Sequence, residues 1–314
     1  MAFLDICFIG NGSHANRIKK ILSNIESNFN FIEHDRKVNL ELQPDVLNSD
    51  IIFITSPNHT HIDYLRKLSK IYQGYVYCEK PPVNKFEDLE IFDLINSSKI
   101  FFGFNYRYSE IQEFIHQTKD KYDLGELINI NIHMSYPFSI KENYQHSWKS
   151  DINKSPSGVI ENLGIHYIDL SVTFLGTVKQ VFLNSTNINK TGTADDTASI
   201  SLFHENGSTS QIFVSYATLA RENMYFVFER GDINYNGNEL NAYYPRETFN
   251  NEGLSIRPPI VLSKSISSEL LSSRSLRNCI NYFINIASRN DSFNHDFFNK
   301  SRISTLAMLG KVEN

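Results

Sequence analysis

The sequence lacks an excess of positive charge and lacks long hydrophobic runs. Its 314 residues carry a formal net charge of −5, which gives a nucleic-acid partner no support. No apolar run is long enough to span a bilayer, and the short one near the start leads directly into glycines, without the basic stretch and cleavage site of a leader. We therefore expect neither a nucleic-acid partner nor a membrane partner.

Cysteine is also scarce, and its three positions are scattered along the chain. Cys7, Cys78 and Cys279 show no paired spacing, which argues against a disulfide framework and against a zinc site and fits a reducing cytoplasm. His59 and His61 form an H-x-H pair, but no third ligand is spaced near them. We expect a cytoplasmic protein without a metal ion, and we find no internal repeat or low-complexity tail.

The first third of the chain alternates short apolar strands with amphipathic helices. Strands are predicted at 6–9, 29–35, 51–54, 75–78 and 100–104, with helices through 15–25 and at 59–72, 86–96 and 109–121. The continuous apolar run at 51–54 is typical of a strand whose two faces are both covered by helices. This alternation predicts a parallel, doubly wound sheet.

A glycine turn follows the first predicted strand. Gly10, Gly12 and Ala15 form G-x-G-x-x-A between a strand and a helix, where backbone N–H groups can approach a pyrophosphate. By itself the pattern is about as compatible with an ordinary tight turn. Asp35 ends the second strand 23 residues after Gly12, close to the spacing of a ribose-binding acid. Asp35 favours NAD, although it could be a turn residue, and Arg36 beside it leaves NADP open.

Polar residues gather where the later strands end, and ligands of such sheets bind outside these carboxyl ends. They are Thr55, Pro57 and Asn58 after the third strand, Glu79 and Lys80 after the fourth, and Asn105 and Arg107 after the fifth. Most lysines in turns are simply solvated. Lys80, however, ends a buried strand, and the fixed φ of Pro81 and Pro82 gives the chain a rigid exit. We expect its amine to point into a crevice, where it can steady a carbonyl or hydroxyl oxygen.

The remaining two thirds have the composition of a sheet. Residues 127–134 alternate, with Ile128, Ile130, Ile132 and Met134 expected on one face, and further strand-like segments with Gly or Asn-Gly turns follow. Helices at 267–287 and 297–309 close the chain. We predict a dinucleotide-binding Rossmann domain at 1–121 and an α+β domain at 122–314 with a large, mainly antiparallel sheet. The second domain would bind substrate and form a homodimer or homotetramer through its sheet.

Residues 161–170, ENLGIHYIDL, predict a buried helix with a polar stripe. Asn162, His166 and Asp169 are spaced i, i+4, i+7, which places them on one helical face. The stripe is either a satisfied structural network or one wall of a catalytic cleft. Because histidine titrates near neutrality, His166 suits proton transfer in the second case.

Taken together, these segments resemble the glucose–fructose oxidoreductase, inositol dehydrogenase and rhizopine-catabolism (Gfo/Idh/MocA) family of NAD(P)-dependent sugar oxidoreductases. The resemblance covers nearly the whole chain and rests on GNGSHA, SPNHTH, CEKPP, GFNYRY, SGVIENLGIHYID and DDTASISLF in this order. It implies a hydride transfer to or from a sugar hydroxyl or ketone, with Lys80 positioning substrate and cofactor and His166 as the general acid/base.

The resemblance also carries over the rest of the expected site. The cofactor-binding residues would be Gly10, Asn11, Gly12, Ser13, His14, Asp35, Arg36, Thr55, Pro57, Asn58, His61, Glu79, Lys80 and Asn105. Arg107, Trp148, Lys149, Asn162 and Asp169 would contact or shape the substrate pocket, and Asn162 would join the catalytic group.

Two positions depart from the family's pattern. The usual acid four residues before the histidine is Asn162, and the usual run of glycines is reduced to Ser157-Gly158. An amide can orient His166 or bind a hydroxyl but cannot stabilise an imidazolium as a carboxylate does, so His166 would work alone or use Asp169. Similar members with a neutral residue here act on nucleotide-linked sugars in surface-polysaccharide pathways, which suggests that substrate class.

Two other functions remain open. One is a glycosidase that keeps NAD bound and oxidises its sugar transiently, with Tyr144 or Tyr167 as an extra base. The other is a non-catalytic, dinucleotide-binding regulator, against which the joint presence of Lys80 and His166 argues.

Overall fold

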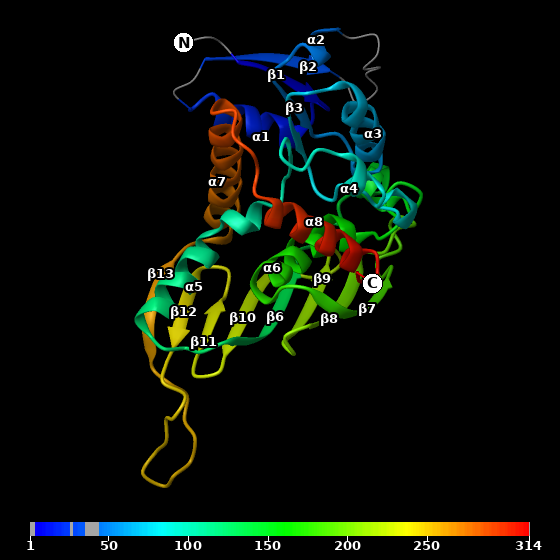
Figure 1. The fold of residues 1–314 in the computed structure, drawn as a ribbon. Helices are drawn as coiled ribbons and strands as arrows, with labels where there is room; N and C mark the ends of the chain where they lie inside the picture. The colour runs from blue at the N-terminus through cyan, green and yellow to red at the C-terminus, as the bar shows by residue number, and fades with distance from the viewer. Residues whose placement is uncertain (1–3, 26–27, 35–43, 314) are drawn as a thin grey trace.

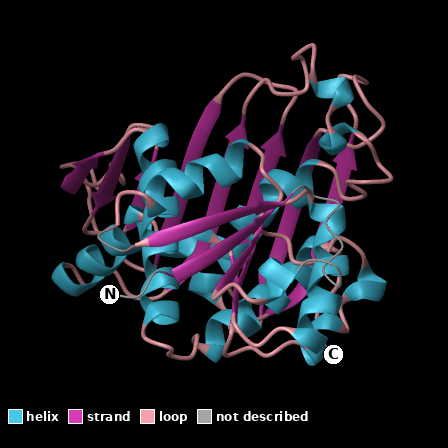
Figure 2. Cartoon of the chain, turned by 90° about the horizontal axis from the view of Figure 1, so that it is seen from above, coloured by secondary structure: helices cyan, strands magenta, loops and turns pink. Residues whose placement is uncertain are grey.

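The computed structural model describes residues 4–25, 28–34 and 44–313. Two sheets divide it into an upper and a lower half, with helices between and beside them (Figures 1 and 2). Asp35 and Arg36 lie outside the described residues, so the prediction that rests on them is not addressed by the structure. Within the described ranges, no helix is long and apolar enough to cross a membrane.

The upper half is the expected parallel sheet, in the order β2-β1-β3-β4-β5. Its strands are β1 (Leu4–Ile9), β2 (Phe29–His34), β3 (Ile51–Ile54), β4 (Tyr75–Cys78) and β5 (Ile100–Phe102). The helices that follow them are α1 (Ser13–Leu22), α2 (Pro44–Leu47), α3 (His61–Ile71), α4 (Ile91–Leu94) and α5 (Glu110–Lys121). The carboxyl ends of β1, β3 and β4 therefore lie side by side at one edge of this sheet.

The helix predicted at 86–96 is shorter than expected. A 3-10 turn, Phe86–Asp88, precedes the single helical turn α4. Ile91 and Phe92, adjacent in sequence, are both buried, whereas Phe86 and Leu94 are exposed. Since helices bury residues three and four apart, this segment lacks the stripe that would hold a long helix against the sheet.

The lower half is a large sheet in the order β13-β12-β11-β10-β6-β9-β8-β7, antiparallel except between β6 and β9. Its strands are β6 (Leu127–Ser135), β7 (Val178–Thr186), β8 (Thr197–His204), β9 (Thr209–Ser215), β10 (Arg221–Phe228), β11 (Asp232–Tyr235), β12 (Glu239–Tyr243) and β13 (Ile260–Ser265). Strands β12 and β13 were not predicted, and the connection between them projects away from the body (Figure 1).

The expected alternation in β6 holds from Ile130 onward, with Ile130, Ile132 and Met134 buried. Ile128, expected with them, is exposed because the pairing between β6 and β10 shifts its register beside it, at Phe228. A bulge of this kind moves a side chain to the other face of the sheet.

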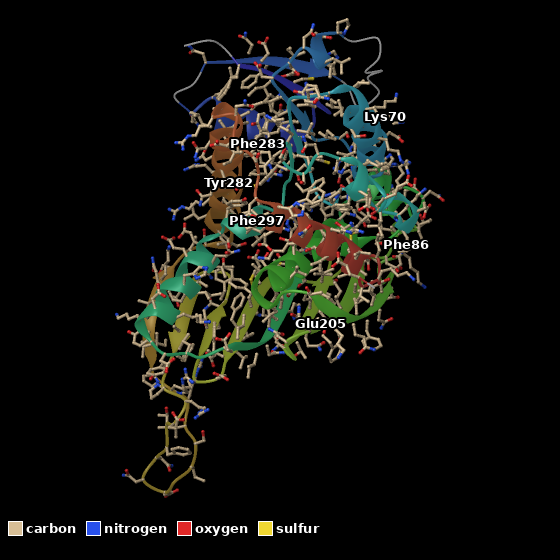
Figure 3. The ribbon with its side chains drawn as sticks, in the orientation of Figure 1. Lys70, Phe86, Glu205, Tyr282, Phe283 and Phe297 are labelled. Atoms are coloured by element: carbon tan, nitrogen blue, oxygen red, sulfur yellow. The ribbon has the colours of Figure 1, made fainter. Side chains whose placement is uncertain are left out.

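Three later helices connect the halves. Helix α6 (Ile165–Leu175) packs against β6 and β9 of the large sheet, and α8 (His295–Met308) lies against α6. Helix α7 (Ser268–Ser288) instead covers the upper sheet, although it follows the lower sheet in sequence. The Phe283 ring lies 5.2 Å from that of Phe53 in β3 and 5.4 Å from that of Tyr77 in β4 (Figure 3). Helix α7 therefore links the last strand of the large sheet to the core of the upper sheet.

Candidate functional site

A cavity of about 990 Å³ opens where the carboxyl ends of the upper strands face α6 and the large sheet. The predicted site residues that line it are Gly10, Asn11, Gly12, Ser13, His14, Thr55, Pro57, Asn58, Glu79, Lys80, Asn105, Trp148, Lys149, Asn162 and His166. The glycine turn and the lysine therefore share one space with a histidine that comes from the other half of the molecule. His61, Arg107 and Asp169 do not line this cavity.

The glycine turn leaves the N-terminus of α1 open. Gly12 is the N-cap of α1 and no side chain caps its first N–H groups, while a Cβ added at Gly12 would meet no atom within 4 Å. Gly10 has φ +96°, and a Cβ there would lie 2.7 Å from the backbone of Ser56. The turn thus needs glycine at position 10 for close packing on β3, and it presents free backbone donors at the helix end, where anions bind.

The lysine is held by the backbone of the helix that carries the histidine. Nζ of Lys80 donates to the carbonyl oxygen of Asn162 at 2.9 Å. Burial lowers the pKa of Lys80 to about 8, with Lys149 adding repulsion and Glu79 and Glu161 opposing the shift. A lysine with such a pKa remains mostly charged at neutral pH but gives up its proton more readily than an exposed one.

Glu79 forms the support beside this lysine. Its carboxylate lies 2.7 Å from Nε2 of His14 and accepts a hydrogen bond from the Tyr77 hydroxyl at 3.0 Å. Burial acts to raise the pKa of Glu79, but His14, Lys80 and the Tyr77 hydroxyl outweigh it and lower the pKa to about 2. The side chain therefore remains an anion that ties the glycine turn to the end of β4.

His61 has a structural place instead of a cofactor contact. It is fully buried, and its ring nitrogens lie 2.8 Å from the Pro81 carbonyl oxygen and 2.9 Å from that of Ser56. The ring joins the turn after β3 to the turn after β4, and so helps to fix the backbone from which Lys80 projects.

His166 faces the cavity from the first turn of α6. Burial, followed by the positive charges of Lys80, His14 and Lys149, lowers its pKa well below the usual value. Its Nδ1 is buried and has no hydrogen-bond partner in the described part of the chain. The Tyr106 ring lies 5.5 Å from the imidazole. A neutral imidazole keeps one ring nitrogen as an acceptor, so His166, which lines the cavity, can accept a proton from a bound ligand.

The predicted polar stripe is split, because the segment before α6 is a π-helical turn, Ile160–Gly164. A π turn holds one more residue than an α turn and rotates the residues before it. The Asn162 amide donates to the Ser155 hydroxyl at 2.8 Å and to the Gly158 carbonyl at 2.9 Å, instead of pointing to His166. At this site Asn162 contributes its backbone carbonyl, which binds Lys80.

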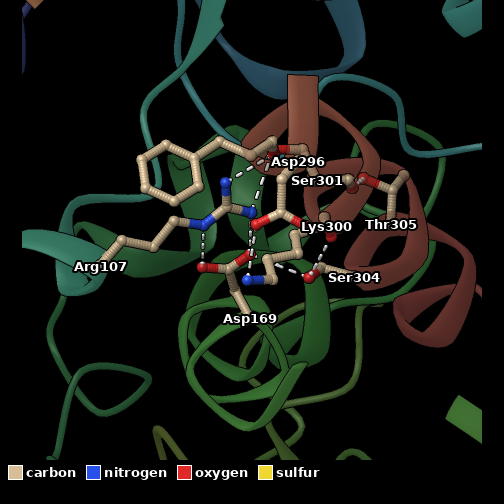
Figure 4. A network of polar contacts seen from close by, with 8 residues as sticks. Arg107, Asp169, Asp296, Lys300, Ser301, Ser304 and Thr305 are labelled. Atoms are coloured by element: carbon tan, nitrogen blue, oxygen red, sulfur yellow. Dashed lines mark hydrogen bonds and ion pairs between the residues drawn. The ribbon is translucent and has the colours of Figure 1, made fainter. Parts of the chain in front are cut away.

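Arg107 and Asp169 form a buried ion pair away from the cavity (Figure 4). Nε and Nη2 of Arg107 donate to the Asp169 carboxylate at 2.9 and 2.5 Å, and Nη1 donates to the Phe297 carbonyl at 2.6 Å. Ser304 donates to the same carboxylate at 2.9 Å. This differs from the expected contact with substrate, and Asp169 is not placed to assist His166.

Sequence reasoning missed a buried acid beneath the site. Glu161 has no exposed surface, and its carboxylate accepts hydrogen bonds from the Asn58 amide and the Ser157 N–H, both at 3.2 Å. Burial raises the pKa of Glu161 to about 7. An α-helix assumed through 161–170 gave no reason to single out this residue, because only the π turn directs it toward Asn58.

It also missed many of the residues that line the cavity. The additional lining residues are Tyr106, Met134, Tyr136, Leu163, Tyr216, Glu222, Ser268, Ser272 and Leu276, and Tyr167, expected only as a glycosidase base, lines the cavity as well. Arg17, Glu33, His34, Ser56 and Gly103 complete the lining on the upper side. These residues come from segments scattered over the chain, and their sequence neighbourhoods share no motif.

Comparisons with known proteins agree with this architecture. Residues 114–234 match the model of the GFO/IDH/MocA C-terminal domain. The chain is 31% identical over 127 residues to glucose-6-phosphate 3-dehydrogenase of Bacillus subtilis, covering 39% of this chain and 35% of that protein. It is 42% identical over 60 residues to D-apiose dehydrogenase of Rhizobium rhizogenes, covering 19% and 17%. The matched segments thus span about a third or less of these curated relatives.

Solved structures share the whole fold at low sequence identity. Levoglucosan dehydrogenase in complex with NADH has a TM-score of 0.78 and 14% identity, covering 98% of this chain and 96% of that one. An oxidoreductase from Agrobacterium radiobacter in complex with NAD+, L-tartaric acid and magnesium has a TM-score of 0.74 and 17% identity, covering 98% and 95%. The GFO/IDH/MocA C-terminal domain model thus matches residues 114–234, and the fold of the whole chain is shared with these solved oxidoreductases.

Proposed function

We propose that this protein is an NAD-dependent oxidoreductase that moves a hydride to or from a sugar carbon bearing a hydroxyl or ketone. The observation that carries the proposal is that Lys80 and His166 line one cavity together with the glycine turn. The likeness to a glucose-6-phosphate and a D-apiose dehydrogenase supports a sugar as substrate.

The residues present fit a dinucleotide. The uncapped N-terminus of α1 and the open space at Gly12 suit a pyrophosphate. The related folds bound to NAD+ and NADH support NAD as the cofactor. NADP remains an alternative, because Asp35 and Arg36 lie outside the described residues. When bound, the nicotinamide supplies the hydride acceptor or donor.

The chain's own residues handle the proton and the charge. In the oxidation direction, neutral His166 accepts the proton of the sugar hydroxyl. The Lys80 ammonium stabilises the negative charge that develops on that oxygen, and the Asn162 carbonyl keeps its Nζ in place. In the reverse direction, protonated His166 returns the proton to the oxygen.

The test compares Lys80→Ala and His166→Ala with the parent chain in single-turnover nicotinamide absorbance, on a sugar that the parent oxidises. We expect both variants to lose about 100-fold or more in rate, as for a removed acid/base or charge stabiliser. NADH binding, followed through Trp148, the sole tryptophan of the chain, should persist in His166→Ala. Unchanged rates in both variants would refute the assigned roles.

A nucleotide-linked sugar from surface-polysaccharide synthesis is the narrower form of this proposal. It rests on the neutral Asn162 in place of the family's usual acid. Thermal-shift titrations with NAD, NADP and nucleotide sugars test it, since a ligand that binds only the folded state raises the melting temperature with concentration.

The glycosidase alternative gains little from the site. Tyr167 lines the cavity, but burial raises the pKa of its phenol well above the usual value, which opposes a role as base. Tyr144 does not line the cavity, and burial raises its pKa to about 12. Release of an aglycone without a net change in nicotinamide absorbance would nevertheless favour the glycosidase.

A homodimer or homotetramer through the large sheet remains a prediction. Large apolar or aromatic side chains are exposed on its strands, among them Ile128, Phe182 and Tyr225. Sedimentation velocity of the parent and of Phe182→Ser tests whether these side chains hold two copies together.

A further inference from the structure

One carboxylate of the cavity has no cationic partner. Glu222 lies on β10 opposite Met134 of β6, and both side chains line the cavity. In the described part of the chain, Glu222 forms no ion pair. A hydrogen bond from the Ser268 hydroxyl of α7 acts to lower the pKa of Glu222. Burial raises the pKa of Glu222. A partly buried acid without a counter-charge is destabilising unless a ligand supplies one.

Tyr106, Tyr136 and Tyr167 line the same cavity as this acid. Burial raises the pKa of each of these phenols, and of Tyr235 nearby in sequence to β10. The negative charge of Glu222 adds a smaller increase in all four cases. The phenols are therefore neutral at neutral pH. The rings of Tyr106 and Tyr167 lie 5.6 Å apart. The faces of aromatic rings attract cations and disfavour anions, so both the acid and its surroundings favour a positive group.

Cationic groups also line the cavity. They are His14, Arg17, Lys80 and Lys149, with the acids Glu33 and Glu79 lining it as well, and the cations suit phosphates and a developing oxyanion. The Tyr106 ring lies 5.5 Å from that of His166, and the charge of Glu222 raises the pKa of the Tyr106 phenol after the larger effect of burial. A sugar ring with its reacting hydroxyl at His166 would extend across Tyr106 toward Glu222.

We propose that Glu222, together with Tyr106, Tyr136 and Tyr167, forms a subsite for a substrate ammonium group, so that the substrate is an amino sugar. The placement of the sugar ring rests on the proposed oxidoreductase function. A neutral hydroxyl would give Glu222 a hydrogen bond, but only an ammonium gives it both the hydrogen bond and the missing charge. The subsite therefore selects on charge and not on ring shape alone.

The test is equilibrium binding of glucosamine and glucose, which differ in one group, with NADH present. Trp148 lines the cavity and is the only tryptophan, so its fluorescence reports occupancy without turnover. At a pH where the amine is protonated, glucosamine should bind about tenfold or more tightly than glucose, as expected for a hydrogen bond to a charged group. Glu222→Gln should abolish this preference while keeping the affinity for glucose.

The matched control is Glu205→Gln, an exposed acid in the turn after β8 and outside the cavity lining (Figure 3), which should keep the preference. Tyr106→Phe is a second variant. It retains the aromatic ring and should keep at least part of the preference for glucosamine. Equal binding of the two sugars by the parent, or an unchanged preference in Glu222→Gln, overturns the subsite.

The outcome is separable from the proposed function. Loss of NADH binding or of hydride transfer would refute the oxidoreductase, whereas the comparison of the two sugars uses binding alone. A preference for glucosamine that depends on Glu222 but occurs without hydride transfer would support the subsite and refute the oxidoreductase.

Discussion

The buried pair of Arg107 and Asp169 offers a sharp test of how the halves of the molecule are joined. Asp169→Asn removes the charge and keeps the size of the side chain. The guanidinium would retain the Phe297 carbonyl and the Ser301 hydroxyl as acceptors, but it would lose its counter-charge. Removing one partner of a buried ion pair costs about 3–5 kcal/mol. Because these two acceptors remain, we expect a loss near the lower limit, about 3 kcal/mol.

Urea unfolding followed through Trp148 measures this change, with the slope m checked for constancy. The exposed pair between Arg302 and Asp93, 2.7 Å apart and also reaching from α8, is the matched control. Asp93→Asn should cost less than about 1 kcal/mol, as exposed pairs do. In the double variant Arg107→Leu/Asp169→Asn, the loss should be smaller than the sum of the single losses, because the two residues share one interaction.

A loss below about 1 kcal/mol in Asp169→Asn would refute the structural role assigned from the geometry. If the variant also raised KM for the sugar at unchanged stability, Asp169 would be a substrate contact, as the family resemblance implies.

Four further predictions concern the cavity and the residues that support it. The kcat/KM for oxidation should stay level through neutral pH and fall above about pH 8, because burial lowers the pKa of Lys80 to about 8 and that of His166 well below its usual value; a fall beginning at neutral pH would contradict these shifts. Burial raises the pKa of Glu161 from 4.5 to about 7, so its contribution to stability is complete below 4.5 and is lost by about pH 7, a change on the order of 3 kcal/mol. Urea unfolding across this window should show that slope in the parent and not in Glu161→Gln, and identical slopes would mean that the carboxyl is ionised throughout. Gly10→Ala should lose about 1–3 kcal/mol because of its positive φ and close packing. Gly12→Ala should melt like the parent yet bind NADH more weakly, and equal NADH affinity would argue against a pyrophosphate at this turn.

Much of the upper half was predictable because burial on both faces leaves an unambiguous pattern. The runs 51–54 and 75–78 coincide with β3 and β4 to the residue. Their polar ends then place Lys80 and Asn58 in the cavity, since parallel strands end at a common edge. The place of His166 in the cavity was also predicted correctly. His166 lies in α6, after the π turn, so the π turn did not disturb this prediction.

The partners of these residues could not be read in the same way. An i, i+4, i+7 spacing assumes an unbroken α-helix, and the π turn at 160–164 directs Asn162 to Ser155 and Glu161 to Asn58. Arg107 was placed correctly at a strand end, but α8, whose contribution depends on tertiary packing, provides its acceptors. Glu222 lies in strand β10. The alternation of this strand predicts which face of the sheet Glu222 occupies, but it does not predict which segments of the chain pack against that face.

The path of α7 has a consequence for how the chain can be divided. The predicted boundary between 121 and 122 separates the upper sheet from the helix that supplies Leu276, Ile280 and Phe283 to its core. A fragment ending at 121 would leave Phe53 and Tyr77, both fully buried in the whole chain, without this cover. We expect such a fragment to aggregate when expressed alone and to become soluble when a peptide of the α7 sequence is supplied in trans. We therefore expect the upper half to need α7, which follows the large sheet in sequence, in order to fold.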